Sequence, residues 1–504
     1  MSAGWEQSVA ASGDLDQGDS EVLRKPLDSD EMSVSSMDPL TRRDFAGGGL
    51  ATIALAWMMA DSAASASTDG AKPLLHFPPK AKRVIQIFCM GGVSHVDTFD
   101  YKPDLTANDG KALTGKGTPD TFFGQPGNLM KPQFRFERRG KSGLWVSDLL
   151  PHLATCTDDM TFLYSMTSKS SNHTPATFFM NSCFTMNGFP CLGSWLSYGL
   201  GSQNEDLPTF VVLPDPRGLP AGGSINWTNG FLPAAHQGVE IHSGKTPVPD
   251  LFPAAGGSLP AFNAGSRFAQ TENREYAKSN PGDSELAARI RSYELAARMQ
   301  TSVPIALNLD KETEQTKRMY GLDRPASAGF AGNCLMARRL IEQGVRFVQV
   351  IHGGAFGGNP RINWDGHENL AKNHQQQAES MDQPVAALLQ DLKQRGLLED
   401  TLLVWTTEFG RTPMTQGVGA PGRDHHPHVF TVWMAGAGLR RGFGYGSSDE
   451  IGYNPGSNAL EVYDLHATIL HLLGLDHKRL TFYHNGIKRR LTDVHGDVIR
   501  GILS

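Results

Sequence analysis

Histidines recur in four short polar segments of this 504-residue chain, three of which also contain carboxylates, and their spacing suits metal binding. Asp365 and His367 stand two residues apart, so one turn can present both side chains to the same cation. Imidazole and carboxylate ligands without thiolates suit Zn²⁺, Mn²⁺, Mg²⁺ or Ca²⁺. The four segments are Gly91–Asp100, Thr167–Pro175, Trp364–Asn369 with the flanking His352 and His374, and Thr407–Pro413 with Gly422–His428.

The second segment adds hydroxyl groups to this chemistry. Several serines and threonines lie beside His173 and could supply a nucleophile once a base or a metal ion activates it. A solvated loop would explain any single segment. However, three successive polar groups at Asp424, His425 and His426 are costly to bury without partners. The four segments together therefore indicate one functional site.

Each polar segment directly follows an apolar run that we predict to be a strand. Such runs, apolar on both faces and alternating with helical patterns, favour one α/β domain whose largely parallel central sheet lies between helices. Ligands in these folds bind at the carboxyl ends of the strands. The predicted strands are 84–90, 161–166, 209–213, 346–351, 401–406 and 429–435. The predicted helices are 148–156, 192–200, 284–299, 329–343, 375–395 and 465–473.

Composition excludes several classes of protein. Hydrophobic residues make up 39% and charged residues 19%, which is typical of a globular protein and not of a disordered, collagen-like or multi-span membrane protein. The net charge is −6, but residues 1–40 carry nine acids and two bases, so the rest of the chain sums to +1. We therefore expect no nucleic-acid partner. Five cysteines without a CxxC pair predict neither a disulfide framework nor a thiolate zinc site.

An export signal is predicted in residues 41–66. Paired Arg42 and Arg43 precede an uncharged run at 46–60, and small residues follow at 64–66. This order resembles a twin-arginine export signal. The run of about 15 residues is shorter than the ~20 that span a bilayer, so we expect no permanent membrane span. The expected partner is the twin-arginine export machinery, and the expected location is periplasmic or extracellular.

The predicted signal divides the chain into three parts. We expect residues 1–40 to be an acidic disordered tail or to precede the true start at Met37 or Met32, because such signals begin close to the initiator. Residues 67–504 are expected to form one α/β hydrolase-like domain. Within this domain, residues 215–266 are rich in Gly, Pro, Asn and Ser and predict an irregular excursion that covers or shapes the site.

Several stretches resemble those of a large bacterial "domain of unknown function" family whose members carry twin-arginine signals. The resemblance runs in order from about residue 40 to the C-terminus. That family is in turn distantly similar to the alkaline phosphatase and sulfatase superfamily, which implies an alkaline phosphatase/sulfatase-like fold. The stretches that carry the resemblance are VIQIFCMGGVSHVDTFDYKP, NHTPATFFMN, CLMARRLIEQGVRFVQV, WDGHEN, GLLEDTLLVWTTEFGRTP, GRDHHP and DLHATILHLLGLD.

The resemblance also implies roles for individual positions. It places Asp97 as an early metal ligand, Asp365 and His367 as a later pair, and Glu408 at the acid of an Asp-His pair. The predicted metal ligands are His95, Asp97, Asp365, His367 and Glu408, with His425 and His426, one of which would be the final histidine.

Two departures bear on the implied chemistry. Phe409 stands where the superfamily has the histidine of the Asp-His pair, and no cysteine begins the formylglycine signature C-x-P-S-R, which disfavours a type I sulfatase. The position implied for the nucleophile lies nearest Ser168 or Lys169, with Ser170 and Ser171 adjacent. Ser168 is preferred because a lysine cannot accept a phosphoryl or sulfuryl group as a hydroxyl does.

We therefore predict a secreted, metal-dependent hydrolase that acts on a phosphate or sulfate ester of a polysaccharide or a small molecule. The predicted catalytic residues are Ser168, Lys169 and Arg411. Lys169, Arg411 or Arg423 would stabilise charge on the transferred group, and a neighbouring histidine would protonate the leaving oxygen. The alternative is a secreted binding or scaffold protein that keeps the fold without turnover.

Overall fold

The structure of the chain is a computed structural model. It describes residues 73–504 except 118, 120, 123–124, 243–247, 249–257, 281–283, 358–359 and 418. The predicted acidic segment and the predicted export signal both lie outside the described residues. Within those residues, no helix combines the length and the apolar character that crossing a membrane requires.

A nine-stranded mixed sheet forms the centre of the described domain, in the order β12-β4-β11-β8-β1-β7-β5-β6, with β15 paired to β4. Only β11 runs antiparallel to its neighbours in this sheet. All six predicted strands are present, so the expected α/β fold with a largely parallel sheet is confirmed. The strands are β1 Arg83–Cys89, β4 Met160–Thr167, β5 Phe210–Leu213, β6 Val239–Glu240, β7 Phe347–His352, β8 Thr401–Thr406, β11 Phe430–Gly436, β12 Phe443–Tyr445 and β15 Leu460–Glu461.

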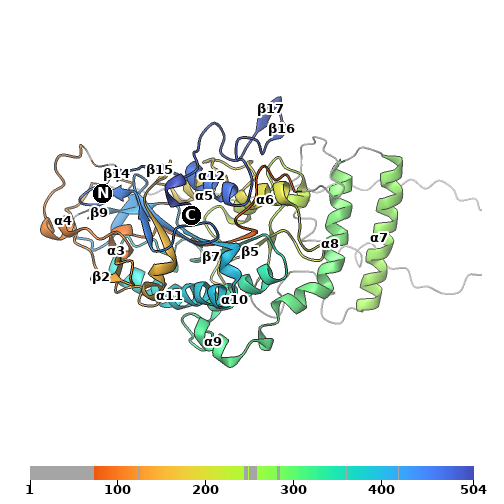
Figure 1. Cartoon of the computed structure of the whole chain (residues 1–504), viewed down its shortest axis with the longest axis horizontal. Coiled ribbons are helices and arrows are strands. Elements are labelled where there is room, and N and C mark those ends of the chain that lie inside the picture. Colours follow the sequence, from red (N-terminus) through yellow and green to blue (C-terminus); the bar gives the residue numbers. More distant parts are fainter. Residues whose placement is uncertain are drawn as a thin grey trace, which may run out of the picture. The chain divides into compact units, whose positions relative to one another are not determined.

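Alternating side chains of the central strand β1 enter two separate hydrophobic clusters. Ile85 and Ile87 belong to the cluster that includes α10 and α11, whereas Val84 and Phe88 belong to the cluster that includes α5, α6 and α12. Figure 1 shows these helix groups on opposite faces of the sheet. Because both faces are covered, the strands are apolar throughout. The helices are α5 His173–Ser182, α6 Leu192–Leu200, α10 Ala328–Glu342, α11 Leu370–Gln394 and α12 Val462–Leu472.

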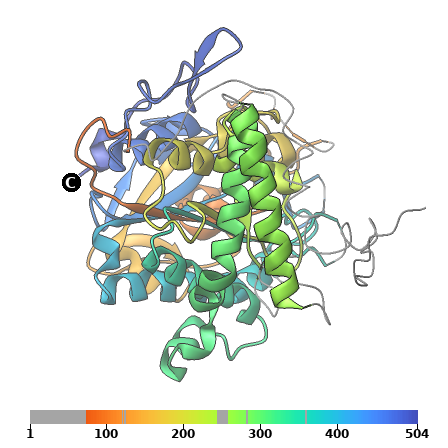
Figure 2. The same cartoon turned by 90° about the vertical axis from the view of Figure 1, so that its right-hand side faces the viewer.

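The Gly- and Pro-rich segment 215–266 contains more regular structure than its composition indicates. It holds β6 and two short 3₁₀ helices, η2 Gly223–Trp227 and η3 Ala234–His236, and α7 (Leu259–Ser279) begins inside it. Figure 2 shows α7 lying beside α8 (Ser284–Leu307), in green. Residues 243–247 and 249–257 of this segment lie outside the described residues.

A two-stranded antiparallel ribbon connects the sheet to the candidate site. Its strands are β9 (Gly410–Thr415) and β10 (Arg423–His426), which follow β8 and precede β11. His425 pairs with Arg411 across the ribbon, and the register shifts between Arg423 and His425. The ribbon thus places two basic side chains and a histidine near the carboxyl end of β8.

Candidate metal centre

Four side chains converge near the carboxyl edge of the sheet. They are His173, Asp365, His367 and His425, and one ligand atom from each lies within 4.8 Å of the others. His173 begins α5, Asp365 and His367 lie in the loop between β7 and α11, and His425 lies on β10. The Oδ1 atom of Asp365 is 2.7 Å from Nε2 of His367, 3.2 Å from Nε2 of His425 and 3.3 Å from Nε2 of His173.

The second nitrogen of each histidine, Nδ1, faces an oxygen atom outside the group. A proton on Nδ1, donated to this acceptor, leaves the Nε2 lone pair free to bind a cation, whereas a proton on Nε2 would be donated to Asp365. With Nδ1 protonated, three imidazole lone pairs and a carboxylate oxygen face one another, an arrangement that a cation stabilises. The contacts are His173 Nδ1 to Glu408 Oε1 at 2.7 Å, His425 Nδ1 to the Ser171 carbonyl at 2.6 Å, and His367 Nδ1 to Gln416 Oε1 at 2.5 Å.

His173 reaches the group because α5 starts after a five-residue loop, 168–172, that follows β4. Asn172 is the N-cap of α5, and its side chain accepts a hydrogen bond from the Thr174 backbone N–H at 3.3 Å. The sequence pattern indicates His173 only as a neighbour of candidate nucleophiles. The run Asn-His-Thr-Pro after a strand is a helix-start signal that could have placed this side chain at the sheet edge.

Glu408 stands behind His173 and does not belong to the converging group itself. Its Oε1 also accepts the Gly91 backbone N–H at 2.8 Å, and its Oε2 accepts the Thr407 hydroxyl at 3.2 Å. Gly91 has φ +112°, and a Cβ there would lie 2.5 Å from the Asp365 backbone nitrogen. A glycine at this position therefore lets the loop that carries Asp365 approach the end of β1.

Two arginines hold the Asp365 carboxylate from opposite sides. Arg411 Nη2 lies 2.5 Å from Oδ1, and Arg361 Nη1 donates to Oδ2. Burial disfavours the charged carboxylate, but the Arg411 charge and the histidine contacts outweigh that effect and hold the pKa of Asp365 well below its usual range. The Arg411 charge and the histidines therefore favour the ionised form of Asp365.

The histidine pKa values show what charge the group favours. Burial lowers the pKa of His425 to about 3, so this imidazole is neutral at neutral pH. Burial also acts to lower the pKa of His173, but hydrogen bonds to Asp365 and Glu408 outweigh it and raise that pKa above the usual value. The group thus stabilises one added positive charge, whether a proton or a metal ion.

Asp97, a predicted ligand, lies in a different buried network. Its Oδ2 accepts from Arg423 Nε at 2.7 Å and from the Ser94 hydroxyl at 2.5 Å, and its Oδ1 accepts the Gln133 backbone N–H at 2.7 Å. Burial would raise the pKa of Asp97, but Arg423 and these hydrogen bonds lower it below the usual value.

Two further predicted ligands, His95 and His426, also lie outside the converging group. Their Nε2 atoms face the carbonyl oxygens of Gly452 at 2.9 Å and Tyr453 at 2.6 Å, respectively. Both imidazoles are buried, and burial lowers the pKa of each below its usual value. The structure therefore brings together Asp365, His367 and His425 of the predicted ligands and adds His173.

The predicted catalytic residues occupy three different settings. Ser168 donates its backbone N–H to the Pro427 carbonyl at 2.8 Å. Lys169 donates to the Tyr463 hydroxyl at 3.0 Å and lies over that ring, so it faces aromatic side chains. Arg411 alone of the three contacts the converging group. Besides Asp365, it reaches Nε2 of His367 at 3.4 Å and the backbone carbonyls of Gly91, Gly92 and Arg423.

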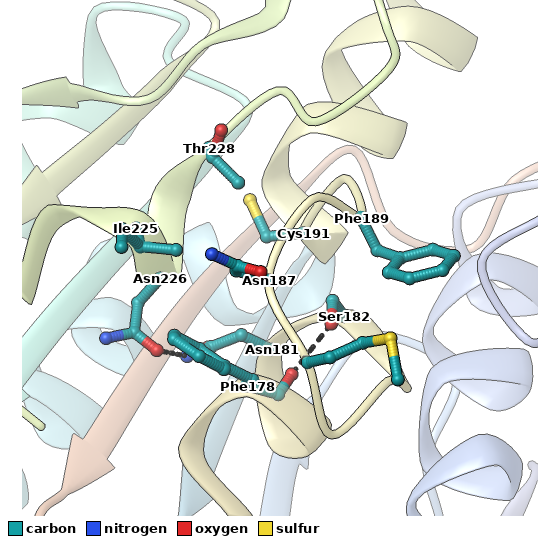
Figure 3. A pocket seen from close by; sticks show the side chains of 10 residues that line it. Phe178, Asn181, Ser182, Asn187, Phe189, Cys191, Ile225, Asn226 and Thr228 are labelled. Atoms are coloured by element: carbon teal, nitrogen blue, oxygen red, sulfur yellow. Dashed lines mark hydrogen bonds between the residues drawn. The ribbon is translucent and has the colours of Figure 1, made fainter. Parts of the chain in front are cut away.

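An open groove leads to the group. It has a volume of about 780 Å³, and His367 and Arg361 line it. A second cavity, near the end of α5, holds only about 10 Å³, roughly the space of one water molecule. Figure 3 shows its amide, hydroxyl and apolar lining, with a hydrogen bond between Asn181 and Asn226. The lining residues of this second cavity include no histidine or carboxylate. We therefore take the groove, and not this cavity, as the route to the four converging side chains.

Fold and site together define an α/β protein with a candidate metal centre at the carboxyl edge of its sheet. Residues 81–503 match the family described as "Protein of unknown function (DUF1501)", and the chain belongs to that family. No curated protein matches the sequence.

Among solved structures, the chain is similar to the alkaline phosphatase from the Antarctic bacterium TAB5, at 10% identity over 79% of this chain and 99% of that chain, with a TM-score of 0.34. It is similar to the PsFucS1 sulfatase from Pseudoalteromonas sp. at 12% identity over 78% and 68%, with a TM-score of 0.33. It is also similar to the zinc-bound C-terminal periplasmic domain of EcEptC from Escherichia coli at 9% identity over 83% and 96%, with a TM-score of 0.32. At these identities and scores the likeness assigns no activity and no residue role.

Proposed function

We propose that this protein is a metal-dependent hydrolase of phosphate or sulfate esters. The observation that carries the proposal is the inward-facing set of three imidazole Nε2 atoms and one carboxylate oxygen, reached from an open groove. Arg411 supplies one positive charge to this set, and a divalent ion would bind the imidazole nitrogens that Arg411 does not reach. The cluster also lies near the carboxyl ends of the strands, which is where ligands usually bind in α/β folds.

These four side chains suit Zn²⁺ better than Mg²⁺ or Ca²⁺. Three imidazole nitrogens and one carboxylate oxygen match the ligands and the number that Zn²⁺ prefers. Mg²⁺ and Ca²⁺ favour six or more oxygen ligands, which the described side chains of this group do not offer. A zinc ion held by His173, Asp365, His367 and His425 would supply Lewis-acid activation of a water molecule or an ester oxygen.

Residues of the chain itself would prepare this site. Glu408 fixes the tautomer and ring orientation of His173, and Arg411 fixes the Asp365 carboxylate. Arg411 has no exposed surface and its donors already reach protein acceptors, so we assign it a positioning role. Ser168 remains the nucleophile to be tested against direct attack by water.

The experiment compares two matched variants of the full chain, Asp365→Asn and Asp97→Asn. Each removes one buried carboxylate charge. We expect elemental analysis to find a divalent metal in the wild type and in Asp97→Asn but not in Asp365→Asn. A panel of phosphate and sulfate esters should be hydrolysed by the proteins that retain metal. Equal metal content in both variants would overturn the metal centre, and failure to hydrolyse any ester with metal bound would overturn the hydrolase.

A binding protein with a structural metal is the second candidate. Four protein side chains already complete a tetrahedral set, whereas catalytic zinc sites usually have three protein ligands and one open position. Metal exchange distinguishes the two functions. Rapid exchange with added Cd²⁺ through the groove together with ester turnover supports the hydrolase, and slow exchange without turnover supports the structural metal.

We also propose that the protein is exported by the twin-arginine route. The support is the sequence alone, namely Arg42-Arg43, the uncharged run 46–60 and the small residues at 64–66. Replacement of both arginines by lysine in the native host should retain the protein in the cytoplasm. Unchanged fractionation of that variant would contradict export by this route.

A further inference from the structure

Arg361 lies between the groove and the candidate metal centre. It belongs to the loop between β7 and α11, its side chain is 26% exposed, and it lines the groove together with His367. Its Nη1 atom donates to Oδ2 of Asp365. One edge of this guanidinium therefore faces the candidate ligands while the rest of it faces the groove.

The groove-facing edge of Arg361 already holds an anion from the chain itself. Nε lies 3.0 Å from Oε2 of Glu368, and Nη2 lies 2.7 Å from Oε1, which makes two parallel hydrogen bonds. Glu368 is 66% exposed and also lines the groove. Because an exposed ion pair contributes little to stability, this carboxylate can leave the guanidinium at small cost.

Among the residues that the structure describes, the other two arginines that contact Asp365 or Asp97 offer no such edge. Arg411 and Arg423 have no exposed surface, and their donors reach Asp365, Asp97 and backbone carbonyls. Among the arginines that contact these two carboxylates, Arg361 alone combines exposure to the groove with a bidentate edge.

We propose that the Nε–Nη2 edge of Arg361 is the subsite for a tetrahedral oxoanion and that Glu368 occupies this subsite in the free protein. A guanidinium binds a carboxylate and a phosphate or sulfate in the same bidentate manner, so an incoming oxoanion can replace Glu368 without rearrangement of Arg361. The inference deepens the proposed function, because the oxoanion would be the phosphate or sulfate group of the ester.

The test measures binding of inorganic phosphate and inorganic sulfate by calorimetry, with metal content determined for each preparation. Glu368→Gln removes the competing charge, and we expect it to bind at least one of the two anions about two- to fivefold more tightly than the wild type. The matched control is Glu399→Gln, which removes an equally exposed partner of Arg441 at 2.6 Å and should bind like the wild type. Unchanged or weaker binding by Glu368→Gln would overturn the subsite.

A second variant shows whether tighter anion binding comes from the release of Arg361 by Glu368 or merely from the loss of one negative charge. Arg361→Lys keeps the positive charge and removes the bidentate edge. In this background Glu368→Gln should no longer strengthen anion binding. An equal gain in both backgrounds would overturn the proposal. These measurements need no turnover, so tighter phosphate binding in a protein that hydrolyses no ester would support the subsite while refuting the hydrolase.

Discussion

Asp97 and Asp365 are both buried carboxylates that follow strands of the sheet, yet their surroundings differ. Every contact of Asp97 described above comes from a hydrogen-bond donor, including the guanidinium of Arg423. Asp365 also faces guanidinium groups, but its Oδ1 lies among three imidazole nitrogens whose other ring nitrogens meet oxygen acceptors. Guanidinium groups thus balance the charge of both carboxylates, and Asp365 differs in that it also faces imidazole nitrogens that could bind a metal ion.

We infer from this difference that the partners of a buried carboxylate decide whether it could bind a metal. Both positions satisfied the sequence criterion of a carboxylate near the end of a strand. A donor such as Arg423 occupies the oxygen lone pairs of Asp97, and an imidazole with its proton fixed on Nδ1 leaves a lone pair for a metal.

The largest effect is expected for Asp97→Ala, which leaves the Arg423 guanidinium buried without its carboxylate. Both side chains have no exposed surface, so the free energy of unfolding should fall by about 3–5 kcal/mol. Urea denaturation measures the change. Glu399→Ala, which removes only an exposed ion pair with Arg441, is the control and should leave the midpoint unchanged. A loss as small as that of the control would mean that the Asp97 pair is not structural.

The next largest effect concerns stabilisation by added metal. Zn²⁺ at about 100 times its dissociation constant should stabilise the wild type by roughly 2.7 kcal/mol, seen as a rise in the thermal midpoint. His425→Gln should lose this response. His426→Gln changes the adjacent buried histidine, whose Nε2 faces the Tyr453 carbonyl, and should keep it. If both variants lost the response, or if neither did, His425 would be no more important for metal binding than His426.

Glu408→Gln should have a smaller effect on the same centre. The carboxylate orients His173 without belonging to the converging group, and loss of such a partner weakens metal affinity by about 10–100-fold. Competition with a chelator of known affinity measures the change. An affinity equal to that of the wild type would show that His173 is oriented without Glu408.

Acid should act on the Asp97 network through its lowered pKa. A carboxyl group whose pKa is lower in the folded state stabilises the fold above its unfolded value, about 3.9, and loses that contribution as the pH falls through the folded value. Stability from this source should therefore be constant between pH 7 and pH 5 and decline only below about pH 4. In Asp97→Asn, the loss of stability below about pH 4 should be smaller than in the wild type. An equal loss in both proteins would mean that other carboxyl groups cause it.

The smallest effect is expected for Lys169→Gln. Its ammonium group contacts the Tyr463 hydroxyl and ring, and such a contact at an exposed site contributes about 0.5–1 kcal/mol. Ester hydrolysis by this variant should stay within about twofold of the wild type. A large loss of turnover with normal metal content would restore Lys169 as a catalytic residue.

Sequence patterns predicted the sheet well because buried strands are short apolar runs with polar ends. They also predicted that Asp365, His367 and His425 belong to a functional site. They could not separate Asp97 from Asp365, because Arg423 lies 326 positions away in the chain and only the fold brings it to Asp97. The oxygen that faces His425 Nδ1 is the backbone carbonyl of Ser171, a group that every residue carries and no side-chain pattern can reveal.

The sequence pattern does not predict α7, for a different physical reason. Leu259 begins this helix within a segment whose Gly and Pro content favours turns, and Ser258 supplies an N-cap that a composition argument overlooks. In contrast, α6 was predicted with its observed bounds because its apolar residues repeat at helical spacing between polar neighbours.

The β9–β10 ribbon bears on how fast a metal ion bound at the candidate centre would be released. Arg411 and His425 lie opposite each other on this ribbon, which is hydrogen-bonded as its own two-stranded sheet and not as part of the central one. A local opening of these two strands would remove one candidate ligand and the counterion of another without unfolding the central sheet. If a bound ion leaves by this opening and not through the groove, the residence time of the metal and the hydrogen-exchange rates of the ribbon amides would change together.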